Sequence, residues 1–303
     1  MGVGASYSPG AKGTTTIPQP TGVNDALDIV RYVAEQTQGA PIVVVIDEME
    51  RLNNASDKNS FAEFIKNLPG VAETVKFIFC GIASDLTELL GAHPSAGRVL
   101  ETIGLQRLRH DSLWQIIISA AEKLDITVPR EILIRISQIS DGFPHYVHLI
   151  GDSLFWTIFD EALPIKSVTE THFRRGVDSA LLRSEPILKA QYDQATKKTK
   201  NTSDYEETLW ALADRSSDRR QITDIYELSY LPMMMRRNGR TALDKNQLNQ
   251  RLLALRKDSH GRIVMGYGSG WFGFRENIMR GYVRLDAEQK GVRLGVSNWS
   301  EEN

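Results

Sequence analysis

The sequence predicts an α/β fold in which a small parallel sheet is followed by an all-helical region and then by a unit of helices and short strands. Two continuous apolar runs, "PIVVVI" and "VKFIFCGI", flank a helical segment, which is typical of parallel strands buried on both faces. From His110 to Arg183 the apolar residues recur with the helical period of 3.6. After residue 203, three helical segments precede short strands around glycine turns.

Composition limits the classes of protein that the chain can belong to. It has 303 residues, of which 41% are hydrophobic and 24% charged, as in a globular protein of one large or two modest domains. No apolar run approaches the ~18 residues of a membrane span, and no signal pattern opens the chain. We therefore expect a cytoplasmic protein with no membrane partner. The single cysteine, Cys80, excludes a disulfide within the chain.

The first part of the sequence has a regular order of elements. Residues 1–22 are rich in Gly, Pro, Ser and Thr, which predicts a flexible arm. Asn24 is the expected N-cap of a helix that ends near Gln36. The strand "PIVVVI", the helix "SFAEFIKNL" and the strand "VKFIFCGI" follow, and residues 102–108 ("TIGLQRL") are a candidate third strand.

Four helical segments form the predicted bundle, and a polar, Lys-rich stretch separates it from the C-terminal unit. Three helices and a β-hairpin wing in that unit predict a winged helix, with "GRIVMGYGSGWFGFRENIMRGYVRL" as two or three strands. The expected boundaries are 23–109 for the sheet region, 110–183 for the helical bundle, 184–203 for the linker, 204–290 for the winged helix and 291–303 for a tail.

Charge is distributed unequally between the two halves of the chain. Residues 21–180 hold 14 Lys and Arg against 22 Asp and Glu, whereas residues 181–303 hold 21 against 16. The basic half is the part that nucleic acid would meet, although an excess of this size does not establish such a partner.

Two adjacent carboxylates, Asp47 and Glu48, end the first predicted strand, in the form of a Walker B element. Side chains at the carboxyl end of a parallel strand point into the ligand crevice of the sheet. Because Mg²⁺ prefers oxygen ligands and keeps several waters, Asp47 is the candidate magnesium ligand. Glu48 is the candidate for orienting the water that attacks a γ-phosphate. The alternative is that both carboxylates cap the turn and helix that follow.

The order of segments over residues 24–285 resembles the AAA+ and STAND superfamily of P-loop ATPases, in particular initiator-like and transposition-type bacterial ATPases. The resemblance implies a catalytic set of Asp47, Glu48, Ser84 and Arg98, with ATP and Mg²⁺ as cofactors. Ser84, at the end of the second strand, would sense the γ-phosphate, or else would cap "DLTELL". Arg98 would reach the phosphate of a neighbouring subunit in a homo-oligomer, or else is a solvated loop residue.

The segment "SDGFPHYVHLIGD" resembles the GxP motif of STAND ATPases through Gly142, Phe143 and Pro144. Pro144 and His145 are therefore the candidate nucleotide contacts. The sequence departs from other AAA+ proteins here, because His145 and His148 stand where a sensor-2 arginine is expected. As a metal pair the histidines lack a third ligand nearby, so packing or capping is the favoured role.

The chain contains no Gly-Lys-Ser or Gly-Lys-Thr, so the phosphate-binding GxxxxGK[ST] loop is missing. Lys12 lies in a glycine-containing stretch, but no apolar strand precedes it. The resemblance implies that the sequence is the C-terminal portion of such an ATPase, without a central strand of its sheet. Three explanations are open: the gene starts further upstream, the segment was excised, or a natural remnant persists with a protein partner that completes the sheet. We expect ATP and Mg²⁺ binding only when the loop is supplied, and a catalytically silent isolated chain.

The third helix of the predicted winged helix, "DKNQLNQRLLALRKD", carries candidate DNA contacts. Arg275 and Arg280 would flank it on the wing. The alternative is an amphipathic helix whose charges face solvent, in a winged helix that acts as an intramolecular clamp. The candidate nucleic-acid residues are Lys245, Gln247, Asn249, Gln250, Arg251 and Arg262, with Arg256 and Lys257 beside them.

Two functions follow from these observations. The first is an ATP-binding AAA+/STAND-type ATPase that acts as a nucleotide-dependent switch associated with duplex DNA. The second is a non-enzymatic DNA-binding or interaction protein that uses the winged helix on an ATPase-derived scaffold. No Ser-His-Asp or Cys-His constellation stands out in the sequence, which argues against another hydrolase chemistry.

Overall fold

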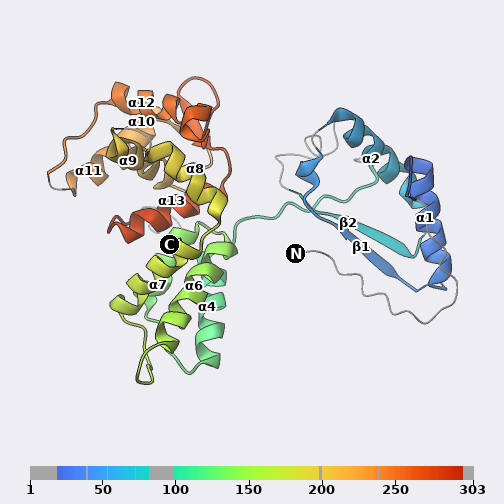
Figure 1. Cartoon of the computed structure of the whole chain (residues 1–303), viewed down its shortest axis with the longest axis horizontal. Helices are drawn as coiled ribbons and strands as arrows, with labels where there is room; N and C mark the ends of the chain where they lie inside the picture. The colour runs from blue at the N-terminus through green and yellow to red at the C-terminus, as the bar shows by residue number, and fades with distance from the viewer. Residues whose placement is uncertain are drawn as a thin grey trace. The chain divides into compact units, whose positions relative to one another are not determined.

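The computed structural model describes residues 19–38, 40–52, 54–71, 73–81, 98–197, 200–237 and 239–295. The chain divides into two compact units, Met1–Leu105 and Gln106–Asn303, here called the N-terminal and the C-terminal unit (Figure 1). None of the described helices has the length and apolar character that crossing a bilayer requires.

The N-terminal unit contains a parallel pair of strands joined through a helix. Strand β1 (Ile42–Ile46) pairs with β2 (Val75–Phe79), with Val44 opposite Phe77. Between them lie a 3₁₀ turn (Met49–Arg51), helix α2 (Ala55–Asn67) and a second 3₁₀ turn (Leu68–Gly70). Helix α1 (Val23–Gln36) precedes β1 and packs against α2. The predicted parallel sheet of an α/β core is therefore confirmed.

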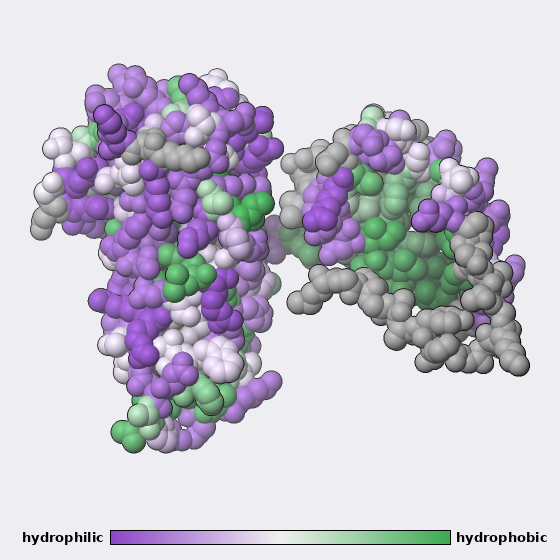
Figure 2. Space-filling view, in the orientation of Figure 1, coloured by the Kyte–Doolittle hydropathy of each residue, from purple (hydrophilic) through white to green (hydrophobic). Residues whose placement is uncertain are grey.

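The two faces of this sheet are in different environments. One face packs on a core of Met49, Ala62 and Ile65. On the other face Val43 is 60% exposed, Val45 59% and Ile78 49%. Figure 2 shows this apolar surface over the strands of the N-terminal unit. The sheet is thus buried on one face only, although its sequence is typical of strands buried on both.

Two sequence expectations for the N-terminal unit are wrong. Helix α1 begins at Val23 with Gly22 as N-cap, so Asn24 lies in its first turn. The carboxylate of Asp25 accepts hydrogen bonds from the backbone N–H and the hydroxyl of Thr21, which fixes the earlier start. Residues 102–108 form no strand, because the described chain offers them no strand to pair with and Leu105 is 93% exposed.

In the C-terminal unit, four helices form the predicted bundle: α4 (His110–Lys123), α5 (Arg130–Ser140), α6 (Pro144–Phe159) and α7 (Glu170–Arg183). Their apolar stripes meet in one core that includes Ile136, Ile150, Leu154 and Phe173. Helix α8 (Pro186–Thr196) follows in the segment expected to be a linker. It packs into the fold through Leu188 and Tyr192, whose hydroxyl donates to Asp286 over 2.6 Å.

A helix–sheet region, residues 202–274, forms the next part of the C-terminal unit. It runs α9 (Thr202–Ala213), β3 (Arg220–Gln221), α10 (Ile222–Ile225), a π-helical turn (Tyr226–Tyr230), α11 (Leu231–Met235), α12 (Lys245–Ala254), a 3₁₀ turn (Asp258–His260), β4 (Val264–Gly266) and β5 (Trp271–Phe274). The strands form an antiparallel sheet in the order β3-β5-β4.

The last described element corrects the prediction of strands after residue 274. Residues Ile278–Gln289 form helix α13, which contacts α5 and α7 of the bundle and also α8 and α9 (Figure 1). Gly281, which suggested a turn, is required by packing, because a Cβ there would lie 2.1 Å from the Tyr146 ring. Helix α13 therefore joins the two parts of the C-terminal unit.

Candidate functional site

The predicted acidic pair lies at the carboxyl end of β1, beside the end of β2. The Met49 N–H donates to the Cys80 carbonyl over 3.0 Å, which holds the two strand ends together. Glu48 adopts the left-handed conformation, with φ of 60°, which costs a non-glycine residue about 1–2 kcal/mol. Both carboxylates are exposed. The backbone thus turns sharply at the two residues that carry the candidate chemistry.

Within the described part of the chain, each carboxylate of the pair has a local contact. Asp47 Oδ1 accepts a hydrogen bond from the Glu48 N–H over 2.8 Å. Glu48 Oε2 lies 3.0 Å from Nε of Arg51, and both side chains are more than half exposed. An exposed ion pair of this kind contributes little to stability and is easily exchanged for a ligand.

The donor set fits a magnesium ion that takes most of its ligands from elsewhere. The described residues contain no group of three or more His, Cys, Asp or Glu side chains able to hold a metal. Mg²⁺ is commonly held by one or two carboxylates together with water and substrate phosphates. Asp47, exposed at a strand end, provides a ligand of that type. The residues therefore fit a shared magnesium site and not an all-protein cage.

The other predicted nucleotide residues are divided between the two units. Ser84 lies outside the described residues. Arg98 is exposed in the N-terminal unit. Pro144 and His145 open helix α6 in the C-terminal unit, and both are exposed. His145 Nε2 lies 3.9 Å from Glu185, and its ring meets the Tyr146 ring edge-on.

The predicted nucleic-acid residues lie on or near α12, but several are held by the fold. Lys245 donates to the Thr223 hydroxyl, and Gln247 closes a capping box with Asp244. Arg251 pairs with Asp204 at 3.0 Å. The side chains of Gln250 and Arg262 are exposed, and Asn249 is half-buried. The outer face of α12 therefore presents amides more than guanidinium groups.

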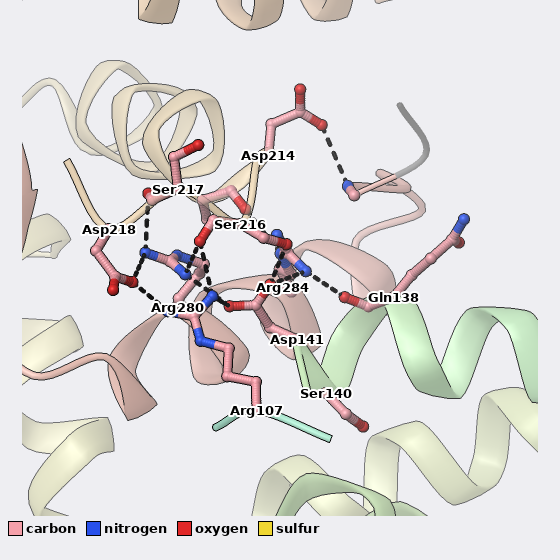
Figure 3. A network of polar contacts seen from close by, with 12 residues as sticks. Arg107, Gln138, Ser140, Asp141, Asp214, Ser216, Ser217, Asp218, Arg280 and Arg284 are labelled. Carbon is pink, nitrogen blue, oxygen red and sulfur yellow. Dashed lines mark hydrogen bonds and ion pairs between the residues drawn. The ribbon is translucent and has the colours of Figure 1, made fainter. Parts of the chain in front are cut away.

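Arg280, expected on a wing, is instead buried in α13, where it is 1% exposed. It belongs to a polar network centred on Asp141, whose side chain is inaccessible to solvent (Figure 3). The Asp141 carboxylate lies 2.9 Å from Arg107, 2.6 Å from Arg280 and 3.0 Å from Arg284. It also accepts the Ser216 hydroxyl. One carboxylate therefore holds three guanidinium groups.

This network ties the bundle to the helix–sheet region. Asp141 ends α5, Arg280 and Arg284 come from α13, and Ser216 follows α9 (Figure 3). Burial alone would raise the pKa of Asp141, but Arg284, Arg280 and Arg107 together hold that pKa below its usual value. The carboxylate is therefore ionised in the folded protein and fixes the relation of the two regions.

Gly142 of the predicted GxP motif has a structural role in the same network. Its φ is +82°, and a Cβ there would lie 2.5 Å from the Cβ of Arg107. Its carbonyl accepts the Leu108 N–H over 2.9 Å. Only glycine satisfies both the positive φ and the close approach. The motif therefore positions Arg107 next to Asp141.

Sequence reasoning missed Asp141, Arg107, Ser216 and Asp218 as a set. The four residues lie far apart in the chain, and each has the appearance of a solvated loop residue. The one local signal is the run Ser140-Asp141-Gly142-Phe143-Pro144, in which an acidic residue stands immediately before the motif glycine. Asp141 is itself left-handed, with φ of 51°.

The fold that these elements build is similar to that of a Walker-type ATPase of known structure. The parallel β1-α2-β2 unit with an acidic pair after β1, followed by the helical bundle, matches the resemblance inferred from the sequence. That resemblance is confirmed at the level of the fold.

Among solved structures, the chain is similar to the Walker-type ATPase PABY2304 of Pyrococcus abyssi, with a TM-score of 0.51. The identity is 15%, and the match covers 92% of this chain and 72% of that one. Cdc6p from Pyrobaculum aerophilum matches with a TM-score of 0.41 at 15% identity, over 90% of this chain and 74% of that one. The first likeness concerns the fold alone, and the second is too low to carry an argument. No protein-family model and no curated protein sequence matches the chain.

Proposed function

We propose that this chain is part of a nucleotide-dependent switch of the AAA+/STAND type, in which Asp47 and Glu48 form a Walker B element. Asp47 would hold Mg²⁺, and Glu48 would orient the attacking water. The bound Mg²⁺ and ATP supply the charge neutralisation and the phosphoryl group. Pro144 and His145 contact the nucleotide, Ser84 senses its γ-phosphate, and Arg98 acts on the nucleotide of a neighbouring subunit.

The observation that carries the proposal is the geometry of the strand end. Two exposed carboxylates follow a parallel strand, and Glu48 is held in an unfavourable left-handed conformation. A helix cap alone does not need this arrangement, because Asn54 caps α2 by accepting the Asp57 N–H. The strained backbone is therefore better explained by the ligand chemistry of the pair.

The proposal includes a phosphate cradle that this chain does not encode. The sequence has no Gly-Lys-Ser/Thr, and the exposed face of β1 and β2 leaves room for more polypeptide against the sheet. A strand–loop–helix segment that carries GxxxxGK[ST] would complete both the sheet and the nucleotide site. Without it, the acidic pair holds no ATP and the chain does not hydrolyse it.

The test compares the full chain alone with the chain joined to such a segment. With the segment, we expect Mg²⁺-dependent binding of a fluorescent ATP analogue and slow hydrolysis. Asp47→Ala should remove the magnesium dependence, while Glu48→Gln should keep binding and lose hydrolysis. The matched control is Asp57→Ala, an exposed carboxylate of α2. Equal binding by wild type and Asp47→Ala would refute the assignment.

A second candidate function is DNA binding by a winged helix. The elements of this region follow the order of helices and strands in that fold: α9, β3, α10 with α11, α12, β4 and β5. The sheet order, β3-β5-β4, also matches it. Helix α12 would be the recognition helix, with Gln250 exposed on it. Arg262 and Arg275, exposed beside the β4–β5 hairpin, would contact phosphates. The alternative role, an intramolecular clamp, uses the buried network and needs no DNA.

The two roles differ in their dependence on salt. Fluorescence anisotropy of a labelled duplex, measured without nucleotide, should show that log K falls linearly with log salt concentration if DNA binds. Arg262→Ala should then lower the slope by about 0.9, the value for one lost phosphate contact on B-DNA. Arg174→Ala, an exposed arginine of α7, should leave it unchanged. Absence of binding at low salt would leave only the clamp.

A further inference from the structure

A cationic cavity lies in the C-terminal unit. Its volume is about 520 Å³, and it is bounded by the start of α4, the end of α5 and Arg284 of α13. The charged side chains that line it are Arg107, Arg109, Arg130 and Arg284 against Asp111 and Asp141. Neither Asp47 nor Glu48 lines it.

The guanidinium groups beside this cavity exceed the carboxylates available to them. Arg280 and Arg284 are 1% and 2% exposed in their side chains, and both share Asp141 with Arg107. The second carboxylate of the network, Asp218, is 57% exposed and pairs with Arg107 and Arg280. Asp214 acts on Arg284 as a third negative charge. The cavity lining, with four arginines against two aspartates, still keeps an excess of positive charge in a poorly solvated place.

Two guanidinium donors have no acceptor. In the part of the chain that the structure describes, Nη2 of Arg284 and Nε of Arg280 are buried without a hydrogen-bond partner. Burial lowers the pKa of Arg284. Buried donors are normally satisfied, and an unsatisfied charged donor is costlier than a neutral one. Arg284 also lines the cavity, so its charge acts directly on whatever occupies that space.

The other walls suit an oxyanion attached to a planar group. Helix α4, which has 14 residues, begins at the cavity, and no side chain caps its N-terminus. The Ser112 N–H of its first turn donates to Asp111 Oδ1 over 3.0 Å, so the donors for an oxyanion come from the arginines and not from the helix start. The guanidinium of Arg130 lies 5.7 Å from the centre of the Trp114 ring, and both line the cavity. Such a pair offers a face on which a planar ring can stack.

We propose that this cavity binds a small phosphate-bearing anion, with the phosphate held by the Arg107 guanidinium beside the buried Arg284. Arg107 is suited to this contact because its side chain is 27% exposed, whereas Arg280 and Arg284 are enclosed. The bound phosphate offsets the excess charge around Asp141. Its source is either free inorganic phosphate or a phosphate ester whose ring stacks on Trp114. The binding does not depend on the proposed function of Asp47.

The experiment is isothermal titration calorimetry of the full chain, at low salt and in EDTA, with inorganic phosphate in one arm and AMP in the other. EDTA removes any contribution from a magnesium site. We expect a dissociation constant below about 1 mM, the affinity of a few charge-assisted contacts, in at least one arm. Tighter binding of AMP than of inorganic phosphate would identify a phosphate ester with a ring, and equal binding would identify the free ion.

Matched arginine variants locate the binding. Arg107→Gln should weaken it at least tenfold. Arg130→Gln, which leaves the Asp141 network intact, should weaken AMP at least threefold. Arg174→Gln on α7, 74% exposed and outside the cavity, should bind as the wild type does. Thermal unfolding checks that each variant is folded. The proposal is overturned if neither ligand binds up to 10 mM, a concentration about tenfold above the expected constant, or if Arg107→Gln and Arg130→Gln both bind like the wild type.

Discussion

In the N-terminal unit Asp47 and Glu48 lie exposed at the end of a strand, whereas in the C-terminal unit Asp141 is enclosed by three guanidinium groups. Exposed carboxylates contribute little to stability and remain available to a ligand. A buried carboxylate that holds several cations is needed for folding, because its removal leaves charges without a partner. The two units therefore place their acidic side chains in opposite environments, one exposed to solvent and one enclosed by cations.

The two units also differ in how much of their apolar surface is exposed. In the described residues, the N-terminal unit has one small core, and Val43, Val45 and Ile78 of its sheet are about half exposed or more. The C-terminal unit has two larger cores, and α13 contributes Tyr282 to one and Leu285 to the other. We infer that the C-terminal unit is the more stable part, and the predictions that follow test this difference.

The largest effect is expected for Asp141→Asn. Asparagine tolerates the left-handed backbone at this position, so the change removes mainly the charge. Arg284 then remains buried without an ion-pair partner and Arg280 keeps only the more exposed Asp218, which should lower the free energy of unfolding by about 3–5 kcal/mol. The measurement is urea unfolding followed by tryptophan fluorescence, which reports on the C-terminal unit because all five tryptophans follow residue 105.

The control for this variant is Asp178→Asn, an exposed carboxylate on α7 of the same unit. Its cost should be within about 0.5 kcal/mol, as for most surface changes. A loss of less than 1 kcal/mol for Asp141→Asn, below the ~3 kcal/mol expected for breaking a buried pair, would contradict the structural role of the network.

The same substitution at two glycines compares the packing of the units. Gly281→Ala places a Cβ 2.1 Å from the Tyr146 ring, which is fully buried. Overpacking of this kind should cost about 1–3 kcal/mol. Gly70→Ala in the N-terminal unit meets no atom within 4 Å, so its effect should stay near zero. Urea midpoints measure the stability of both variants, and hydrogen exchange reports on the N-terminal unit. Equal costs for the two substitutions would contradict the difference in packing between the units.

Acid should weaken the C-terminal unit through Asp141. The folded-state pKa of this carboxyl is below its usual value of 3.8, so its stabilising contribution is complete above pH 3.8 and is lost as the pH falls toward the folded pKa. One carboxyl changes the free energy of unfolding by at most about 1.4 kcal/mol per pH unit. Asp141→Asn should therefore flatten the acid limb of a pH–stability curve. An unchanged slope would show that other carboxyls set it.

Much of the architecture follows from local patterns in the sequence. Continuous branched aliphatic runs predict β1 and β2, and the 3.6-residue period predicts α4 to α7, because these signals reside within single segments. Residues 102–108 failed as a strand because a strand also needs a pairing partner, which no local pattern encodes. The same reason explains why the apolar run of β1 predicts burial on both faces although Val43 and Val45 are exposed.

Tertiary contacts explain the remaining differences. Gly281 suggested a turn, yet it sits inside α13 so that the Tyr146 ring can pack against the helix. Arg280 suggested a solvated wing, yet it is buried because Asp141 compensates its charge. The acidic pair of Asp47 and Glu48 was visible in the sequence, since both residues stand together at a strand end. The Asp141 network was not, because its members meet only in the folded chain.

The smallest effect, and the most direct test of the N-terminal unit, is expected for Val45→Thr. The two side chains have similar size and β propensity, so the change mainly adds a hydroxyl to a position that is 59% exposed. On a solvated face the cost should be within about 0.5 kcal/mol, whereas a hydroxyl buried without a partner costs about 1–3 kcal/mol.

Hydrogen exchange of the β1 amides measures the stability cost of Val45→Thr. The control is Ile65→Val in the buried core of the same unit, which is expected to lose about 0.5–1.5 kcal/mol. If Val45→Thr proves the costlier of the two, the apolar face of the sheet is covered in solution. The difference in exposed apolar surface between the two units would then not hold for the protein in solution.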